Sequence, residues 1–467
     1  MIEPFTMSGL AAQLPATHLG EDVGFLSVST DTRSLESGDL FVALRGPNFD
    51  GHEFAKHAVS AGACGLMADH RIDSPAPQLL VSDTREAFGR MASIRRDQFS
   101  FPLVAITGSN GKTTVKEMIA SIFNEVGCTL ATRGNLNNDI GVPTTLLCID
   151  DEHRYAVIEM GANHPGEIAY LTGLTKPDVG VVTNAGAAHL EGFGSVSGVA
   201  DAKGELFDGL SEVGTAVINA DDKFSSRWLK RAGERSILTF GFNESADFRA
   251  RESNMLSTAD ASGLYSKFSM TTPAGVKAVS LSVPGRHNIS NALAAAAAAW
   301  SVGIDLDLIV AGLESLRPVP GRLNLYRSAS GAILIDDTYN ANPASLVAGI
   351  ELLKQFSGKK ILVLGDMAEL GQNTRRLHRE MGVRAKELGI DKLISVGELS
   401  ALAVESFGSA GKTASNIDDA IVRVEKELTQ NACVLIKGSR RMQLDQLVSQ
   451  ALIKFEFQEI SNSEEKF

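Results

Sequence analysis

The hydrophobic residues of this chain fall into short continuous runs, separated by longer stretches in which apolar residues recur with a helical period. A short continuous apolar run indicates a strand buried on both faces, as in a parallel sheet covered by helices. Alternation of such strands with helices predicts an α/β fold. At 467 residues the chain is long enough for two to four domains, and we expect three.

Residues 1–98 predict a small N-terminal α/β domain, and residues 317–467 predict a C-terminal domain with a Rossmann-like, doubly wound sheet. The N-terminal pattern consists of strands at 39–44, 64–67 and 79–81 and helices at 53–60 and 84–97. The C-terminal pattern follows a proline-punctuated linker at 317–321 and has strands at 332–335, 360–364, 392–396 and 433–436. Residues 456–467 are expected to fray.

Residues 99–316 predict a central domain built on a parallel sheet. Its apolar strands are expected at 101–106, 155–158, 179–182 and 215–218. Residues 245–283 alternate between polar and apolar positions, which indicates an antiparallel appendage. The alanine run at 292–299 predicts a tightly packed helix, because Leu293 and Trp300 supply apolar bulk beside the small residues.

The sequence TGSNGKTT at residues 107–114 lies between the strand at 101–106 and a helical pattern at 115–123. In a phosphate-binding loop, glycines let backbone N–H groups close around phosphate oxygens, and the helix N-terminus adds partial positive charge. Lys112 would then reach the β- and γ-phosphates, and the Thr113 hydroxyl would bind Mg²⁺. A plain strand-to-helix turn is the alternative. The residues expected to contact nucleotide here are Thr107, Gly108, Ser109, Asn110, Gly111, Lys112, Thr113 and Thr114.

Two details bear on this prediction. Phosphate loops usually have a glycine at the position of Ile106, so the match is not strict. The sequence GSAGKT at residues 408–413 repeats the same spacing, but it follows a helix-like stretch at 398–405 instead of a strand. We therefore expect 408–413 to be a polar turn before the next helix.

Composition excludes several classes of protein. With 44 basic and 56 acidic side chains the formal charge is −12, and no long basic run is present, so nucleic acid is not an expected partner. The four cysteines are scattered, which fits a reducing compartment and argues against a zinc site. The N-terminus has no signal-peptide pattern, and no uncharged apolar stretch reaches about 18 residues. A cytoplasmic protein without membrane insertion is expected.

Polar residues at strand ends are candidates for chemistry. Glu159 ends the strand at 155–158, on the edge where open α/β sheets bind ligands, and could reach a nucleotide-bound magnesium ion. Its alternative role is to pair with a lysine. His189 follows the next strand, and the pattern leaves structural and functional roles equally open. Spacing alone presents Lys203 as a solvated helix residue. Asn291 lies at the start of the alanine-rich helix, where its amide could cap the helix or bind a base.

The predicted C-terminal domain, residues 317–467, also has polar groups at its strand ends. Residues 335–343 combine two acids, two amides and a tyrosine, a set that is costly to bury and suits polar recognition. The segments at 320–322, 365–371 and 437–440 could face the same cleft.

The sequence resembles the Mur ligases. The segments TGSNGKTT, IEMGA, AAHLEGFGS to AKGEL, GRHNISNALAA, PGR, DDTYNANPAS and LGDMAELG follow one another in the order and spacing of that family, and the resemblance covers nearly the whole chain. Residues 29–33, 38–46 and 50–52 are similar to the family's UDP-sugar-binding domain. DDTYNANP is the most specific segment, and it resembles the branch that adds D-alanyl-D-alanine to UDP-MurNAc-tripeptide.

The resemblance implies a reaction in three steps. ATP phosphorylates the terminal carboxylate of the tripeptide, the dipeptide amine attacks the acyl phosphate, and an amide and phosphate are formed. Because an anionic carboxylate attacks an anionic phosphoryl group, catalysis depends on alignment and charge neutralisation. A monomer is expected.

The resemblance also assigns residues. Lys112 neutralises the transferring group, and two Mg²⁺ ions are implied, the first held by Thr113 and Glu159 and the second by His189. Lys203 matches the family lysine that carries a carbamate, an anion able to act as a metal ligand. Nucleotide contacts from elsewhere in the chain are Arg322 at the γ-phosphate, Asp337 at the ribose and Asn291 at the adenine. The implied substrate contacts are Ser29, Asp31, Arg33, Asn135, Asn137, Asn138, Tyr339, Asn340 and Asn342.

Two other interpretations remain. A sister ligase that adds meso-diaminopimelate or lysine, or folylpolyglutamate synthase, would lack the segments at 336–343 and 364–371. A nucleotide-dependent switch would hydrolyse ATP without joining anything, and it would not need two further α/β blocks with polar strand ends. The sequence leaves open which diamino acid the tripeptide carries.

Overall fold

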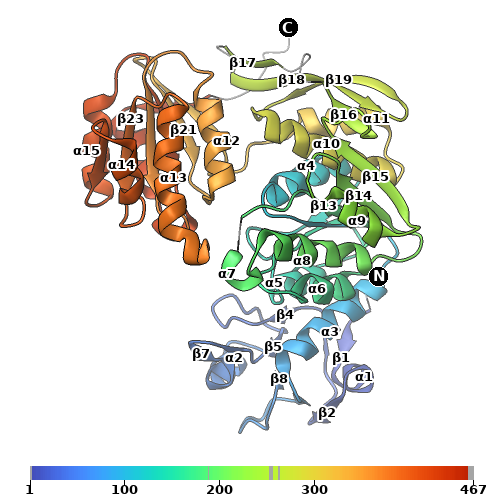
Figure 1. The fold of residues 1–467 in the computed structure, drawn as a ribbon. Helices are drawn as coiled ribbons and strands as arrows, with labels where there is room; N and C mark the ends of the chain where they lie inside the picture. Colours follow the sequence, from blue (N-terminus) through green and yellow to red (C-terminus); the bar gives the residue numbers. More distant parts are fainter. Residues whose placement is uncertain (1–2, 188, 252–255, 261–262, 461–467) are drawn as a thin grey trace.

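The computed structural model describes residues 3–187, 189–251, 256–260 and 263–460. Three α/β units follow one another along the chain (Figure 1). Each is built on its own main sheet, and the central unit lies between the other two in space. Among the described residues, no helix has the length and apolar character needed to cross a bilayer.

The N-terminal unit has a five-stranded sheet in the order β2-β9-β8-β5-β4, with β2 antiparallel to β9 and the other pairs parallel. Its strands are β2 (Ala16–Leu19), β4 (Val28–Ser29), β5 (Leu40–Val42), β8 (Gly65–Ala68) and β9 (Gln78–Val81), with α1 (Met7–Gln13), α2 (Ala55–Ser60) and α3 (Thr84–Asp97). Two short antiparallel pairs are β1 (Phe5–Thr6) with β3 (Gly24–Phe25) and β6 (Arg45–Gly46) with β7 (Phe49–Asp50). The helix expected at 53–60 begins as a 3₁₀ turn, η1 (Gly51–Phe54).

The central unit has a ten-stranded sheet in the order β11-β12-β10-β13-β14-β15-β16-β18-β17, with β19 pairing β18. The strands are β10 (Leu103–Thr107), β11 (Thr129–Ala131), β12 (Tyr155–Glu159), β13 (Val179–Val182), β14 (Thr215–Asn219), β15 (Ser236–Gly241), β16 (Phe248–Ala250), β17 (Leu256–Asp260), β18 (Gly263–Thr272) and β19 (Gly275–Leu281). Its helices are α4 (Lys112–Asn124), α5 (Gly141–Leu147), α6 (Glu167–Thr175), α7 (Leu190–Phe193), α8 (Val196–Asp208), α9 (Ser225–Ala232), α10 (Arg286–Ser301) and α11 (Leu306–Glu314).

Burial on both faces explains why these strands read as continuous apolar runs. Val104 and Ile106 of β10 belong to the core packed on α4, α10 and α11, whereas Leu103 and Ala105 belong to the core on the opposite face. The alanine run of α10 is fully buried, as a tightly packed helix requires. The expected appendage is antiparallel from β16 to β19, and β16 joins it to the parallel sheet by pairing with β15.

The C-terminal unit has a seven-stranded sheet in the order β24-β23-β22-β25-β21-β20-β26. The strands are β20 (Asn324–Ser328), β21 (Ile333–Asp337), β22 (Lys360–Gly365), β23 (Lys392–Val396), β24 (Gly411–Ala414), β25 (Cys433–Lys437) and β26 (Phe457–Glu459). The helices are α12 (Pro343–Leu353), η3 (Gly371–Asn373), α13 (Thr374–Glu387), α14 (Ala401–Phe407), α15 (Ile417–Glu427), η4 (Arg440–Met442) and α16 (Asp445–Lys454). The five strands from β24 to β21 are parallel, and β20 and β26 add an antiparallel edge.

Two expectations for this unit are wrong in part. Residues 408–413 do not form only a turn, because Gly411–Ala414 are the edge strand β24. Residues 456–467 do not all fray, because Phe457–Glu459 pair with β20; residues 461–467 lie outside the described part.

Candidate active site

The loop between β10 and α4 has the backbone that a phosphate site needs. Gly108 and Gly111 have φ angles of 153° and 83°. A Cβ on Gly108 would lie 1.8 Å from Thr183 Oγ1, and one on Gly111 would lie 2.4 Å from Asn291 Oδ1, so both positions require glycine. Lys112 Nζ donates to the Gly108 carbonyl at 2.7 Å. Burial lowers the pKa of this lysine, while Glu159 opposes the shift.

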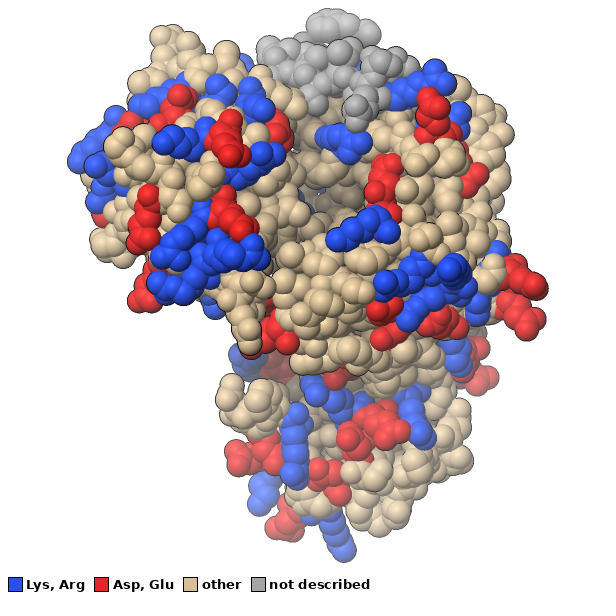
Figure 2. Space-filling model, in the orientation of Figure 1, with Lys and Arg blue, Asp and Glu red and all other residues tan. Residues whose placement is uncertain are grey.

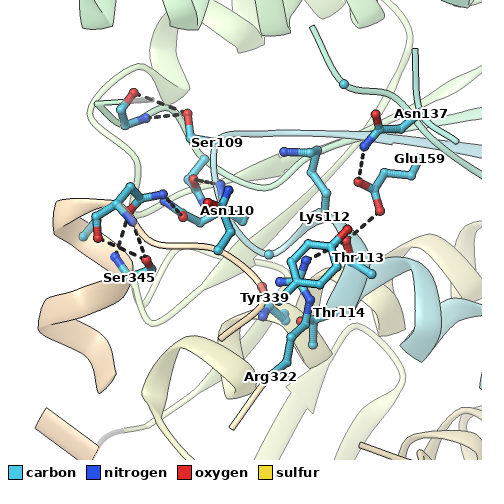
Figure 3. Close-up of a pocket in the computed structure, with 18 of the residues that line it drawn as sticks. Ser109, Asn110, Lys112, Thr113, Thr114, Asn137, Glu159, Arg322, Tyr339 and Ser345 are labelled. Carbon is cyan, nitrogen blue, oxygen red and sulfur yellow. Dashed lines mark hydrogen bonds between the residues drawn. The ribbon is translucent and has the colours of Figure 1, made fainter. Parts of the chain in front are cut away.

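Glu159 lies beside the first turn of α4 and is buried, with 3% exposed. Its carboxylate accepts from Thr113 Oγ1 at 2.8 Å and from Asn137 Nδ2 at 2.8 Å (Figure 3). The backbone N–H of Glu159 donates to Thr132 Oγ1 at 2.9 Å. Among the described residues, the hydrogen-bond partners of the carboxylate are thus a hydroxyl and an amide, which leaves it as an oxygen ligand next to the phosphate loop.

The loop after β13 is hydrogen-bonded to the phosphate loop. Asn110 N–H donates to Asn184 Oδ1 at 3.0 Å, and Gly186 N–H donates to Ser109 Oγ at 2.9 Å. Further along, His189 has a positive φ of 52°. Its Nδ1 lies 2.6 Å from Glu369 Oε2 of the C-terminal unit. The loop thus carries His189 to the boundary between two units.

The spacing alone predicted a solvated side chain for Lys203 on α8, and this prediction is wrong. Lys203 is 1% exposed, and its Nζ has no hydrogen-bond partner among the residues described. Burial, with repulsion from Lys112 next, lowers its pKa to about 7. The spacing contained the signal: Lys203 follows Val199 by four residues and precedes Leu206 by three, which puts it on the apolar face of α8.

The C-terminal unit reaches the phosphate loop directly. Arg322 Nη2 donates to Thr113 Oγ1 at 2.9 Å, and its guanidinium lies 4.3 Å from the Tyr339 ring centre (Figure 3). Asn342 Nδ2 donates to Asn110 Oδ1 at 2.6 Å. Because a sequence separation of about two hundred residues lies between the partners, these contacts form only when the two units come together.

Deeper in the C-terminal unit, Asp337 Oδ2 lies 2.5 Å from Lys437 Nζ, which also donates to the Asn340 carbonyl at 2.9 Å. Burial raises the pKa of Asp337, and Lys437 opposes the rise. At the start of α10 the helix cap is Gly285; Asn291 Nδ2 donates to Asn288 Oδ1 at 3.2 Å, and its Oδ1 faces Gly111. Asn291 therefore does not cap α10.

One cavity of about 1860 Å³ joins these groups, and the molecule is visibly hollowed between the C-terminal and central units (Figure 2). The predicted site residues that line it are Ser109, Asn110, Gly111, Lys112, Thr113, Thr114, Asn135, Asn137, Asn138, Glu159, His189, Asn291, Arg322, Asp337, Tyr339, Asn340 and Asn342. Those that do not line it are Ser29, Asp31, Arg33, Thr107, Gly108 and Lys203. Arg33 pairs with Asp31 at 2.6 Å and points outward, with 88% of its side chain exposed.

Sequence reasoning missed several lining residues. Arg85 at the start of α3 pairs with Asp139 at 2.9 Å, which brings the N-terminal unit to the cavity wall. Glu369 and Arg440 line it from the C-terminal unit, on segments that had been predicted to face the cleft without an assigned role. Asp139 directly follows the predicted Asn138, and that adjacency was the only available signal.

Comparison with known proteins places this geometry in a family context. Three family models match in succession: "Mur ligase family, catalytic domain" at residues 25–96, "Mur ligase middle domain" at 106–299 and "Mur ligase, glutamate ligase domain" at 321–440. The UDP-N-acetylmuramoyl-tripeptide–D-alanyl-D-alanine ligase of Escherichia coli is 45% identical over 95% of this chain and 97% of its own. The Haemophilus influenzae protein of the same name is 41% identical over 94% of this chain and 96% of its own.

Solved structures agree. A crystal structure of MurF from Acinetobacter baumannii has a TM-score of 0.91 at 36% identity, covering 97% of this chain and 99% of that one. The MurF ligase of Thermotoga maritima in complex with ADP has a TM-score of 0.82 at 27% identity, covering 92% of this chain and 98% of that one.

Proposed function

The chain belongs to the Mur ligase family, and we propose that it is the ATP-dependent ligase that joins D-alanyl-D-alanine to UDP-MurNAc-tripeptide. The substrates follow from the shared name of its relatives. The observation that supports the chemistry is the contact between Arg322 and Thr113 at 2.9 Å. It brings a cation from a separate unit to a phosphate loop, as transfer of a charged phosphoryl group to a carboxylate requires.

We assign the nucleotide to the cleft between the central and C-terminal units. Lys112 and the loop amides would neutralise the transferring phosphoryl group, with Arg322 on its other side. Asp337 would accept from the ribose hydroxyls, and Asn291 would lie against the adenine. These roles are supported by positions on one cavity wall. The three main sheets support domain boundaries close to residues 98 and 316, because each sheet lies within one of the resulting ranges.

The proposed magnesium ligands fit the residues present. Thr113 and Glu159 offer adjacent oxygens 2.8 Å apart, and Asn137 orients the carboxylate from its other oxygen. His189 would bind a second ion near Glu369. When bound, the two ions would supply positive charge that lowers the repulsion between the anionic phosphoryl group and the anionic carboxylate.

The amine of Lys203 is buried and has no hydrogen-bond partner among the described residues, which supports the carbamate. A buried ammonium without hydrogen bonds is costly, whereas a carbamate is an anion that a nearby cation stabilises. Carbamate formation begins with the neutral amine, which forms a nitrogen–carbon bond to CO₂ and releases a proton. The pKa of about 7 leaves a large neutral fraction at neutral pH.

The remaining assignments concern the two acceptor substrates. Asn135, Asn137 and Asn138 would contact the muramyl-peptide, and Tyr339, Asn340 and Asn342 the dipeptide. Ser29, Asp31 and Arg33 would bind the UDP end, outside the main cavity. A monomer and a cytoplasmic location stay predictions.

Mass spectrometry of a reaction containing UDP-MurNAc-tripeptide, ATP and D-alanyl-D-alanine tests the function. The expected product carries both added alanines, and phosphate release depends on both acceptors. A chain that releases phosphate at full rate with neither acceptor present would be a nucleotide switch and not a ligase.

A further inference from the structure

Glu369 and Arg440 are two of the charged side chains of the C-terminal unit that line the cavity without a role in the steps above. Glu369 lies after β22 and Arg440 after β25, and these strands are neighbours in the sheet. The two connections are joined, because Ser439 N–H donates to the Asp366 carbonyl at 3.0 Å. An acid and a guanidinium are therefore held on adjacent loops at one edge of the sheet.

The Arg440 guanidinium is only loosely engaged. Its side chain is 70% exposed, and its paired acid, Asp445, lies at 3.8 Å. Three other cations line the cavity from residues 317–467. Arg322 contacts Thr113, Lys437 pairs with Asp337, and Arg317 lies in the linker before the sheet. Of the cations at the strand ends of this sheet that line the cavity, Arg440 is the most loosely paired and can take a further anion.

Glu369 is positioned towards the reacting end of the site. It has a positive φ of 61°, a costly conformation for a residue with a side chain, and such conformations concentrate at functional sites. Its carboxylate lies 2.6 Å from His189, the proposed metal ligand next to the phosphate loop. A group bound by Glu369 would therefore sit beside the activated carboxylate.

We propose that Arg440 and Glu369 bind the two ends of the incoming dipeptide, Arg440 its carboxylate and Glu369 its ammonium. This assignment rests on the proposed function. A dipeptide is a zwitterion at neutral pH and spans at most about 7 Å, a length suited to adjacent loops. A guanidinium fork matches a carboxylate with two parallel hydrogen bonds. The pair would select a free dipeptide and direct its amine towards His189.

Comparison of D-alanyl-D-alanine with D-alanyl-D-alaninamide, which lacks the carboxylate charge, tests Arg440. The wild-type kcat/KM should fall by about 10- to 100-fold with the amide, the usual effect of losing one charge-assisted contact. Arg440→Gln should show the same loss with the acid and nearly equal values for both compounds. Its KM for ATP should not change, and its unfolding temperature should match the wild type because the side chain is exposed.

Arg375→Gln is the control. Arg375 lies on α13 of the same unit and is exposed, and it is not among the residues that line the cavity. This variant should keep the wild-type preference for the acid. Glu369→Gln should raise KM for the acid and the amide by the same factor, because both compounds carry the ammonium.

An Arg440→Gln enzyme that still prefers the acid over the amide would overturn the assignment. A raised KM for ATP with an unchanged KM for the dipeptide would also overturn it, because Arg440 would then serve the nucleotide. Product formation by the wild type in the same experiment keeps the proposed function standing in both cases. A wild-type enzyme without product would overturn the function and this assignment together.

Discussion

The segments at residues 108–113 and 408–413 share the spacing Gly-x-x-Gly-Lys-Thr, and their surroundings differ at each position that contacts phosphate in a nucleotide site. Lys112 begins α4, and Thr113 is buried against Glu159. Lys412 and Thr413 are exposed on the edge strand β24, and α15 begins only at Ile417. The first segment brings its cation to a cavity at a helix N-terminus. The second leaves its lysine in solvent, while its Gly411 N–H donates to the Gly408 carbonyl and residues 411–414 pair with β23. A motif acquires its chemistry from the elements that follow it.

The largest difference between the two segments should appear on truncating their lysines. Lys112→Ala should lower kcat by roughly 100- to 1,000-fold, because it removes positive charge from the transferring phosphoryl group. Lys412→Ala should leave product formation unchanged. Phosphate release coupled to both acceptors measures both variants. Equal loss in the two variants would mean that the cavity does not hold the nucleotide.

Lys203 gives a second, somewhat smaller effect. Lys203→Ala should lower product formation by about 10- to 100-fold, as expected for loss of a group that supports a metal ligand. A short carboxylic acid added to the assay should restore part of the activity, since it can replace the carbamate in the vacated space. Lys230→Ala on α9, an exposed lysine, is the control.

Stability distinguishes a chemical role of Lys203 from a structural one. Lys203→Met keeps most of the volume and removes a buried amine that has no hydrogen-bond partner among the described residues. Its unfolding temperature should therefore equal or exceed that of the wild type. A marked decrease, together with failed rescue of the alanine variant, would indicate that Lys203 serves packing alone.

The first glycine of each segment gives a third contrast. Gly108→Ala would bring a Cβ within 1.8 Å of Thr183 Oγ1, whereas the nearest atom to a Cβ on Gly408 is Lys386 Nζ at 3.6 Å. Both glycines have positive φ, so both variants carry the conformational cost, and only the first adds overpacking of about 1–3 kcal/mol. Calorimetric unfolding temperatures should rank wild type above Gly408→Ala, and Gly408→Ala above Gly108→Ala. The reverse order of the variants would contradict the described loop geometry.

The same contrast explains what could be predicted from sequence. Central strands such as β10 and β13 were found because burial on both faces leaves a continuous apolar run. The edge strands β24 and β26 were missed because an edge position tolerates short and polar sequences, so their pattern resembles a loop. The hydrophobic pattern therefore predicts a strand well when all of its residues are buried, and poorly when the strand lies at the edge of a sheet.

Site residues follow a similar division. Lys112 and Thr113 belong to one contiguous motif, and their roles could be inferred without the fold. The burial of Lys203 was missed because a lysine within a helix usually faces solvent, although its neighbours marked the apolar face. Arg440 and Glu369 could not be assigned, because their relation depends on two strands becoming neighbours across a long sequence separation.

The smallest predicted effect concerns the enclosure around the first segment. His287 lies in the first turn of α10, close to Asn291 and the phosphate loop, and burial with the nearby charge of Lys437 lowers its pKa from 6.5 to about 4. Between these values the unfolded chain binds a proton that the folded chain does not, so stability is lost as the pH falls from about 6.5 towards 4. Above this window the histidine is neutral in both states and contributes no pH dependence.

His287→Gln should therefore lose less of its unfolding temperature than the wild type when the pH is lowered from about 7 to about 4.5, where the folded and unfolded chains differ in bound protons. His57→Gln on α2, an exposed histidine, should follow the wild-type curve. Parallel curves for the wild type and His287→Gln would mean that the fold does not lower the pKa of His287. The contrast between the two segments would then rest on helix geometry alone.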